Sequence, residues 1–259
     1  MPGQLELSNL AMSTPQKITN AEQLLRIRTL LQHFEQGRIP RLAQHEVHPN
    51  VPLDSRENYL YFTLPVCINF QRSSPAMWAS ALATFNDATT NYVFFPEKLT
   101  EVPMEQIRAD LLKHKLALQP NKHTHIWTTI ASTLHRFYHD DPRQILVEAN
   151  YDAGKLVKDL QATNHSRFPY LSGPKLSNYW PYILSQYTSA PFVNIHELSI
   201  IPDTHVIQSS EHLGLVNQGA SQKQVELAWH ELLDGSGIAP VQMHPVLWNW
   251  SRNHFKPDV

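Results

Sequence analysis

The sequence is poor in cysteine and has no long apolar run. Cys67 is the only cysteine among 259 residues, so the chain forms no internal disulfide and lacks the several thiolates that hold an iron–sulfur cluster. No apolar run is long enough to cross a bilayer, and residues 1–19 lack the basic start and apolar centre of a secretory signal. These absences favour a cytoplasmic protein with no membrane association, in which Cys67 is packed inside the core.

A surplus of positive charge and a zinc-binding pattern are also absent. The net charge is −2, which argues mildly against nucleic-acid binding, although a local basic face is compatible with a neutral total. Fifteen histidines invite a metal site, but HEVH at 45–48 and HTH at 123–125 do not have the spacing of a zinc site, and no HExxH motif occurs. We therefore predict neither a catalytic zinc nor an iron–sulfur cluster.

Apolar residues make up 42% of the chain and charged residues 17%, so the chain is able to build a substantial core. The apolar spacing repeats with the period of a helix in most segments, and alternation typical of strands is missing. These patterns predict an all-α fold. Helices are expected over 20–36, 57–70, 74–85, 103–115, 122–139, 153–164, 176–187, 203–215, 221–234 and 244–255.

Several helix ends carry recognisable signals. Asn20, Ser74 and Ser221 are placed to cap helix starts, and Gly37 and Gly235 to end helices. Residues 1–18 are predicted to be a polar arm, and residues 38–54 to be irregular. The apolar stripes that should face the core are Leu24, Ile27, Leu31 and Phe34 in the first helix, and Ile126, Ile130, Leu134 and Phe137 in the fifth.

Two features suggest chemistry. Residues 168–175 form a short glycine-containing hairpin between two expected helices, and the N–H groups that start the second helix suit a phosphate. Asp203 begins a later helix within IPDTHV. Alone, such a hairpin is most often a plain connection between helices, and an aspartate at a helix start is most often a helix cap.

Together, these motifs resemble the helix-hairpin-helix (HhH-GPD) DNA glycosylase superfamily typified by endonuclease III. GPKLSN at 173–178 is similar to the family's GxKxxN, and PDTHV…LGL at 202–215 is similar to its VDTHV…LGL. CINFQRSSPAMW at 67–78 and LQPNKHTHIWTTIASTL at 118–134 resemble family segments in the same order. The chain departs from the family in lacking the first hairpin glycine and the C-terminal cysteine quartet, and in carrying a longer segment at 185–200.

The resemblance implies two helical lobes with a cleft between them. One lobe is expected to be a helical barrel at 57–190, and the other to combine 19–56 with 191–259. The implied activity is DNA repair by base excision, in which a hydrolase cleaves the N-glycosidic bond of a damaged or modified base, with or without AP lyase activity. Two alternatives stay open: a non-catalytic DNA-binding or interaction module of the same fold, and an N-glycosidase that acts on RNA or a nucleoside.

The resemblance also implies roles for the residues of the cleft. Asp203 is expected to stabilise positive charge on the sugar. Lys175 matches the family's Schiff-base lysine when its GxKxxN motif is aligned. In a second register Ser177 takes that position, as in monofunctional relatives, and Lys175 contacts phosphate or solvent.

The remaining expected roles concern binding. Gln71 matches the residue that fills the space of a flipped base, and Arg72 is placed to touch phosphate. His205 is expected to support Asp203. The expected partner is double-stranded DNA with a flipped base, bound by a monomer without a cofactor, although hairpin carbonyls are compatible with a monovalent cation. The remaining residues expected to take part in binding are Gly173 and Asn178 at the hairpin, and Tyr179 or Trp180 in a base pocket.

Overall fold

The computed structural model describes residues 19–41, 47–163 and 166–259, and the expected polar arm at 1–18 lies outside these ranges. No strand occurs in the described part, where a single isolated bridge joins Asp152 and Val193. The all-α fold predicted from the sequence is therefore confirmed. Its α-helices are α1 (Asn20–Glu35), α2 (Arg56–Tyr61), α3 (Ser74–Asn86), α4 (Pro96–Leu99), α5 (Met104–Lys113), α6 (Pro120–Phe137), α7 (Arg143–Glu148), α8 (Ala153–Thr163), α9 (Pro174–Tyr187), α10 (Thr204–His212), α11 (Gln222–Leu233) and α12 (Met243–Arg252).

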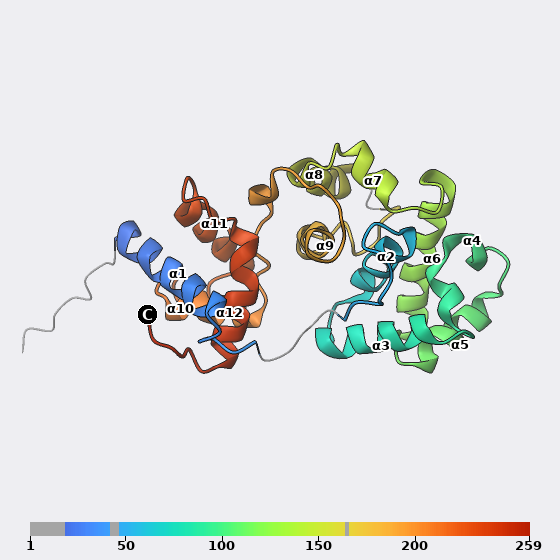
Figure 1. Cartoon of the computed structure of the whole chain (residues 1–259), viewed down its shortest axis with the longest axis horizontal. Coiled ribbons are helices and arrows are strands. Elements are labelled where there is room, and N and C mark those ends of the chain that lie inside the picture. Colours follow the sequence, from blue (N-terminus) through green and yellow to red (C-terminus); the bar gives the residue numbers. More distant parts are fainter. Residues whose placement is uncertain (1–18, 42–46, 164–165) are drawn as a thin grey trace, which may run out of the picture.

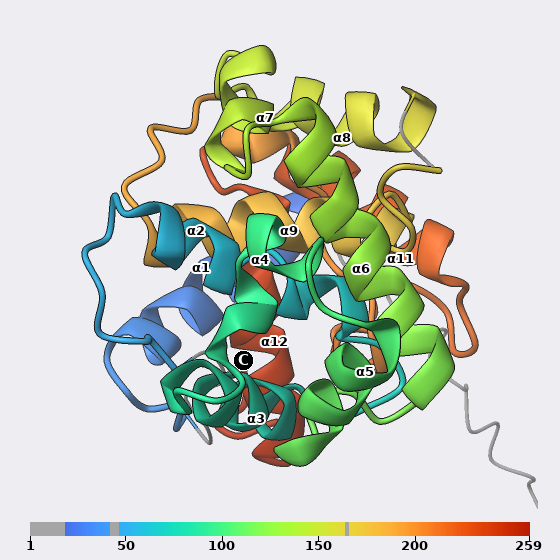
Figure 2. The ribbon, with the colours of Figure 1, turned by 90° about the vertical axis from the view of Figure 1, so that its right-hand side faces the viewer.

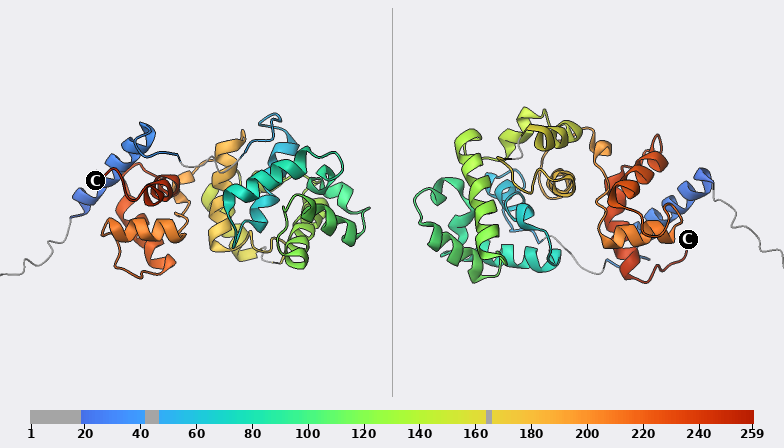
Figure 3. Two further views of the ribbon diagram at one scale, coloured as in Figure 1. Left: turned by 90° about the horizontal axis from the view of Figure 1, so that it is seen from below. Right: turned by 180° about the vertical axis from the view of Figure 1, so that it is seen from behind.

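The helices gather into two lobes (Figure 1). Helices α2 to α8 form the larger lobe. Helix α1, although first in the sequence, packs with the last three helices, α10, α11 and α12, in the smaller lobe. Helix α9 lies at the junction, and the two lobes remain distinct in the views from below and from behind (Figure 3). Seen from the end of the larger lobe, the long helix α6 runs diagonally across its outer side (Figure 2).

Each lobe has its own hydrophobic core. The larger core is rich in aromatic rings: Tyr61 contacts Phe62, Trp78 and Phe94 at centroid distances of 4.9, 5.7 and 5.8 Å. Offset and edge-to-face contacts of this kind stabilise a core beyond the area they bury. Leu198 and Ile201 also belong to this core, and the lobe limits drawn at 57–190 and 191–259 stay a prediction.

The smaller core joins the two ends of the described chain. Ile27 and Leu30 of α1 are fully buried together with Trp229 of α11 and Leu247 of α12. Gln23 adds a polar tie, because its Nε2 donates to the carbonyl oxygen of Leu213 at 2.9 Å. The N-terminal helix is therefore packed into the same core as the C-terminal helices.

The segment 57–70 was predicted to be one buried helix, and the structure corrects this. Helix α2 ends at Tyr61, and a 3-10 helix, η1 (Pro65–Ile68), begins after a break. Pro65 has no N–H to continue an α-helical ladder, so it starts a new element instead. The prediction of burial is confirmed, because the side chains from Asn58 to Asn69 are buried throughout.

The helix-end signals were partly correct. Ser221 caps α11 with a reciprocal capping box, and Gly235 follows that helix with φ +66°. Thr19 caps α1 in place of Asn20. Residue 73 precedes α3 in the cap position, so the prediction for Ser74 was wrong by one. Phe137, predicted to face the core, is 49% exposed because it ends α6 at the surface.

Candidate active-site cleft

A cleft of about 1100 Å³ lies between the lobes. Its walls come from the end of α1, from the link between η1 and α3, from one face along the length of α9, from the start of α10, and from one face of α12. The cleft brings together most of the residues singled out in the sequence, namely Gln71, Arg72, Lys175, Tyr179, Asp203 and His205. Gly173, Ser177 and Asn178 are not among the residues that line it.

Asp203 is both a helix cap and a cleft residue. Its Oδ1 accepts hydrogen bonds from the backbone N–H groups of His205 at 2.9 Å and Val206 at 3.0 Å. These bonds fix the carboxylate at the start of α10, where unpaired N–H groups favour an anion. Within the described residues no donor contacts Oδ2, and the side chain is half-buried. One oxygen is thus used to orient the group, and the other remains available to a ligand.

Lys175 lies in the first turn of α9, directly after the hairpin. Its side chain is exposed and forms no ion pair within the described part of the chain. Gly173 takes the cap position without a side chain to cap the helix. The backbone N–H groups of Lys175 and Leu176 therefore have no intrahelical acceptor, and they are suited to binding a phosphate oxygen.

Two apolar side chains of the hairpin anchor it in the larger core. Phe168 and Leu171 are fully buried in the larger core. The backbone N–H of Ser172 donates to the carbonyl oxygen of Phe168 at 3.0 Å, and that of Gly173 to Tyr170 at 3.0 Å. A Cβ at Gly173 would lie 3.1 Å from the carbonyl oxygen of Tyr170, so the turn is tight enough to favour glycine.

Ser177 and Asn178 have structural surroundings. Ser177 is fully buried, and its Oγ accepts a hydrogen bond from Nε2 of Gln161 on α8 at 2.7 Å. The amide of Asn178 donates to the carbonyl oxygen of Pro174 at 2.8 Å, while its Oδ1 accepts from the N–H of Ser199 at 2.8 Å. Asn178 thereby links the hairpin to the segment that leads to Asp203.

Arg72 does not point freely into the cleft. Its guanidinium donates to the carbonyl oxygens of Leu116 at 2.5 Å and Lys115 at 3.0 Å, so the side chain joins two loops at the rim. Gln71, beside it, is exposed and has φ +52°. A left-handed backbone costs a non-glycine residue about 1 kcal/mol, and such strain is often found at functional sites.

Sequence reasoning did not single out Leu118, which lies on the loop joined to Arg72. Leu118 is 50% exposed, and the amide of the next residue, Gln119, is 3.5 Å from Oε1 of Gln71. Leu118 is therefore an exposed apolar residue on a loop next to the one that carries Gln71, although it is not among the residues that line the cleft. Its exposure is visible only in the structure.

His205 is supported from α12. Its Nδ1 is 3.1 Å from Oγ of Ser251, and its ring meets Trp248 edge-to-face at 5.3 Å. The guanidinium of Arg252 lies 4.6 Å from the Trp248 centroid. Trp248 and Arg252 line the cleft. Trp250, on the same helix, is instead fully buried.

The two pocket candidates on α9 differ. Tyr179 lines the cleft, is 8% exposed, and its hydroxyl is 3.4 Å from Nε1 of Trp78. Trp180 is fully buried, and its indole donates to Oγ1 of Thr63 at 3.0 Å. Trp180 is therefore a core residue rather than a pocket residue.

The residues of this chain do not fit an iron–sulfur cluster. Cys67 is the only thiol in the sequence and is fully buried, and burial raises its pKa well above the ordinary range. Within the described ranges no group of three or more His, Cys, Asp and Glu residues is placed to hold a metal. Nor is any helix there both long and apolar enough to cross a membrane.

The fold has a counterpart among solved structures. The chain is similar to endonuclease III in the structure of a trapped endonuclease III–DNA covalent intermediate, an estranged-adenine complex. The TM-score is 0.58, with 16% sequence identity, over 93% of this chain and 90% of that chain. No family model matches the sequence, and no curated protein matches it either. The chain therefore has an endonuclease III-like all-α fold.

Proposed function

We propose that this protein is a DNA glycosylase that removes a damaged or modified base and also acts as a lyase that cuts the strand at the resulting abasic site. The observation that supports it most is the cleft, in which the Asp203 carboxylate, the Lys175 amine and the uncapped start of α9 face one space between the two lobes. An anion site, an amine and a carboxylate are the groups needed to hold a phosphate backbone and act on its sugar.

Asp203 is proposed to stabilise the sugar as the base leaves. Breaking the N-glycosidic bond leaves positive charge on C1′ and its ring oxygen. The two hydrogen bonds to Oδ1 hold the carboxylate in one orientation, so little reorganisation is needed when the charge develops. His205, braced by Ser251 and Trp248, limits the movement of this helix start.

Lys175 is proposed to be the nucleophile. Its neutral amine attacks C1′, forming a C–N bond as the bond to the base breaks, and the base departs with the electron pair and takes up a proton. The nitrogen loses a proton, and the ring oxygen takes one up as the C1′–O4′ bond breaks, which gives a protonated imine. Loss of a proton from C2′ then expels the 3′ phosphate and cuts the strand. The burial of Ser177 behind Gln161 favours this register over the monofunctional one.

Gln71 and Leu118 are proposed to replace the base that leaves the stack. Flipping a nucleotide leaves a gap in the duplex, and a side chain that fills it offsets part of the lost stacking. The two residues project from loops that Arg72 joins through its hydrogen bonds to the carbonyl oxygens of Lys115 and Leu116. Arg72 is thus proposed to position the rim rather than to bind phosphate.

A panel of duplexes carrying different damaged bases, scored for base release and for strand cleavage, tests the function. On a duplex that the wild type cleaves, Asp203→Asn should lower base release by about 100-fold or more, because it removes charge stabilisation at the sugar. Asparagine is also a good helix cap, so the fold and DNA affinity should be kept.

Asp234→Asn is the matched control, because Asp234 is an exposed carboxylate at the end of α11. It should leave base release unchanged. Native rates in Asp203→Asn, on a substrate that the wild type cleaves, would sink the assignment of Asp203. A wild type that releases no base from any duplex of the panel would sink the proposed function.

A further inference from the structure

An aromatic pair lies between the hairpin and the loop that carries Gln71. The rings of Phe70 and Tyr170 stack with centroids 4.4 Å apart and planes 9° from parallel. Phe70 lines the cleft, and His123 packs against it edge-to-face at 5.2 Å. Phe70 is therefore held between two neighbours, whereas Tyr170 is the outer member of the stack and is 40% exposed.

A lysine accompanies the pair. Nζ of Lys122, in the first turn of α6, is 4.8 Å from the centroids of both rings. Because these two distances are equal, the ammonium lies beside the stack and not over the outer face of either ring. In the described part of the chain no other aromatic or cationic side chain contacts the ring of Tyr170. Tyr170 is 40% exposed, so part of its ring is open to solvent, and the Lys122 ammonium lies at the edge of the stack.

The backbone that carries this aromatic pair is strained on both sides of the stack. Tyr170 has φ +65°, and Gln71, which follows Phe70, has φ +52°. Bulky aromatic residues seldom adopt the left-handed region. The two buried hairpin residues, Phe168 and Leu171, hold Tyr170 in place from either side. The fold thus fixes an exposed ring in an unfavourable backbone conformation, which is a reason to look for a binding role.

We propose that the outer face of Tyr170 is a stacking site for a nucleobase that the bound DNA has unstacked near the lesion. An exposed aromatic face with an adjacent cation is the arrangement that binds unpaired bases, since every base has a π-face and is attached to a phosphate. The stack is continuous with the cleft through Phe70, and Lys122 is placed to meet the phosphate of the same nucleotide. This inference rests on the proposed function for its ligand, but it concerns binding and not catalysis.

The test uses the full chain and a duplex with a single abasic-site analogue. The fluorescent base 2-aminopurine is placed in turn opposite the analogue and at each of its neighbours, because its emission falls when it stacks on an aromatic ring. At one of these positions we expect quenching in the wild-type complex relative to the Tyr170→Leu complex, because only the wild type restacks the unstacked base on a ring. Tyr170→Leu should also weaken binding by about 5- to 100-fold, whereas Tyr170→Phe should retain both the quenching and the affinity.

Phe137→Leu is the matched control, since Phe137 is also exposed and has a cation, Arg167, 4.0 Å from its ring centroid. It should change neither quenching nor affinity. A Tyr170→Leu protein that melts like the wild type but shows unchanged quenching and affinity would overturn the inference. Base release is measured on the same preparations to separate the two proposals. If Tyr170→Leu loses the quenching but the wild type releases no base, only the catalytic function is contradicted. If the wild type releases base but Tyr170→Leu binds and quenches as the wild type does, only the stacking site is contradicted.

Discussion

Lys175 and Ser177 are two positions apart at the start of α9, yet they have different surroundings. Lys175 is exposed and lines the cleft, whereas Ser177 is fully buried and bonded to Gln161. A nucleophile must reach the sugar of a nucleotide bound outside the protein. A buried hydroxyl facing α8 does not meet that requirement, so its surroundings support the proposal that Lys175 is the nucleophile.

Trapping with borohydride tests this assignment. If Lys175 attacks C1′, the reaction passes through an imine, and reduction should give a stable covalent adduct between protein and DNA. Lys175→Ala should yield no adduct on denaturing gels, and Ser177→Ala, the matched control, should yield the wild-type amount. A trapped adduct in Lys175→Ala would contradict the role of this lysine. Clear base release by the wild type without any adduct would establish the monofunctional route.

His123 predicts a pH dependence of stability. The residue is 1% exposed, and its Nδ1 accepts a hydrogen bond from the N–H of Leu118 at 3.1 Å. Burial, together with the charges of Arg72 and Lys122, lowers its pKa to about 4. In an unfolded chain the pKa is about 6.5. The unfolded state therefore binds a proton first as pH falls, and His123 should reduce stability between about pH 6.5 and 4, by about 1–3 kcal/mol.

Urea unfolding at several pH values between 7.5 and 4 measures this effect. His123→Asn keeps a hydrogen-bond acceptor for Leu118 but does not titrate, so its free energy of unfolding should fall less over this interval. Above about pH 6.5 the pH dependence of the two proteins should be parallel. Equal losses in wild type and variant between pH 6.5 and 4 would show that His123 does not contribute.

The candidate site was predictable where a motif marked it, and otherwise not. Asp203, Lys175 and Gln71 belong to segments that resemble a known family, and all three line the cleft. Trp248 was missed for a physical reason. It lies on a helix with an ordinary apolar period, and only the way the two lobes meet decides which apolar side chains remain at the cleft surface.

At the scale of elements, the segment 185–200 is the main departure from the family pattern. It was predicted only as an insertion, and the structure shows that it docks on the start of α8. The backbone of Val193 exchanges hydrogen bonds with Tyr151 at 2.9 Å and Ala153 at 3.0 Å, and Asn194 donates to the carboxylate of Asp152 at 2.7 Å. The connection between the hairpin and Asp203 is therefore anchored along its length.

Gly154 tests this anchoring. A Cβ there would lie 2.0 Å from Oε2 and 3.0 Å from Cβ of Glu197, which belongs to η3 (Ile195–Glu197). Gly154→Ala should lower the free energy of unfolding by about 1 kcal/mol through overpacking, even though alanine is the better helix former. In a Glu197→Ala background most of the clash is gone, and the same change should become neutral or stabilising.

Thermal or urea unfolding of the two single variants and the double variant completes this cycle. Glu197→Ala alone should be nearly neutral, because its ion pair with Lys158 is exposed and 3.3 Å long. If Gly154→Ala stabilises the protein in the wild-type background, helix propensity dominates, and the segment is free to move away from α8.

Helix positions were easier to predict than helix interruptions. Long segments with a regular apolar period, such as α6 and α11, were placed within a few residues. Helices α4 and α7 were not predicted, because 4 and 6 residues are too short for a period to be recognised. The break between α2 and η1 lies at Pro65, which has no N–H to continue the helix.

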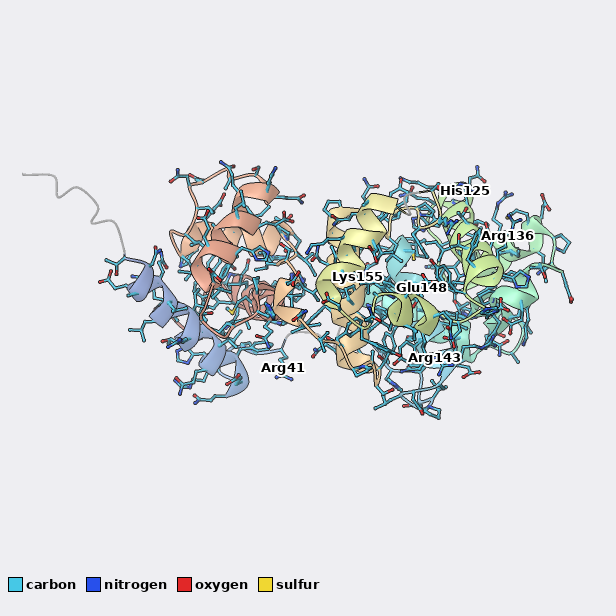
Figure 4. All side chains as sticks on the ribbon, turned by 90° about the horizontal axis from the view of Figure 1, so that it is seen from above. Arg41, His125, Arg136, Arg143, Glu148 and Lys155 are labelled. Atoms are coloured by element: carbon cyan, nitrogen blue, oxygen red, sulfur yellow. The ribbon has the colours of Figure 1, made fainter. Side chains whose placement is uncertain are left out.

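At the scale of the whole molecule, the charge distribution differs from what the net charge of −2 suggests. Cations from both lobes line the cleft: Arg41 and Arg252 on one side, and Lys175 on the other. Figure 4 shows Arg41 at the junction of the lobes, while Arg136 and Arg143 lie far from it on the larger lobe. A nearly neutral chain thus places a small number of positive charges where a phosphate backbone would run.

This arrangement predicts a weak dependence of DNA binding on salt. Each phosphate neutralised contributes a slope of about −0.9 to a plot of log association constant against log salt concentration, so Arg41, Arg252 and Lys122 together should give a slope of about −3. Arg252→Met should reduce its magnitude by about one unit. Lys98→Met is the matched control, because Lys98 is an exposed cation on α4, away from the cleft. Fluorescence anisotropy over a range of salt concentrations measures these slopes. A slope near zero, or equal changes in both variants, would mean that the cleft is not the DNA-binding face, since counterions are released only where phosphates meet the protein's cations.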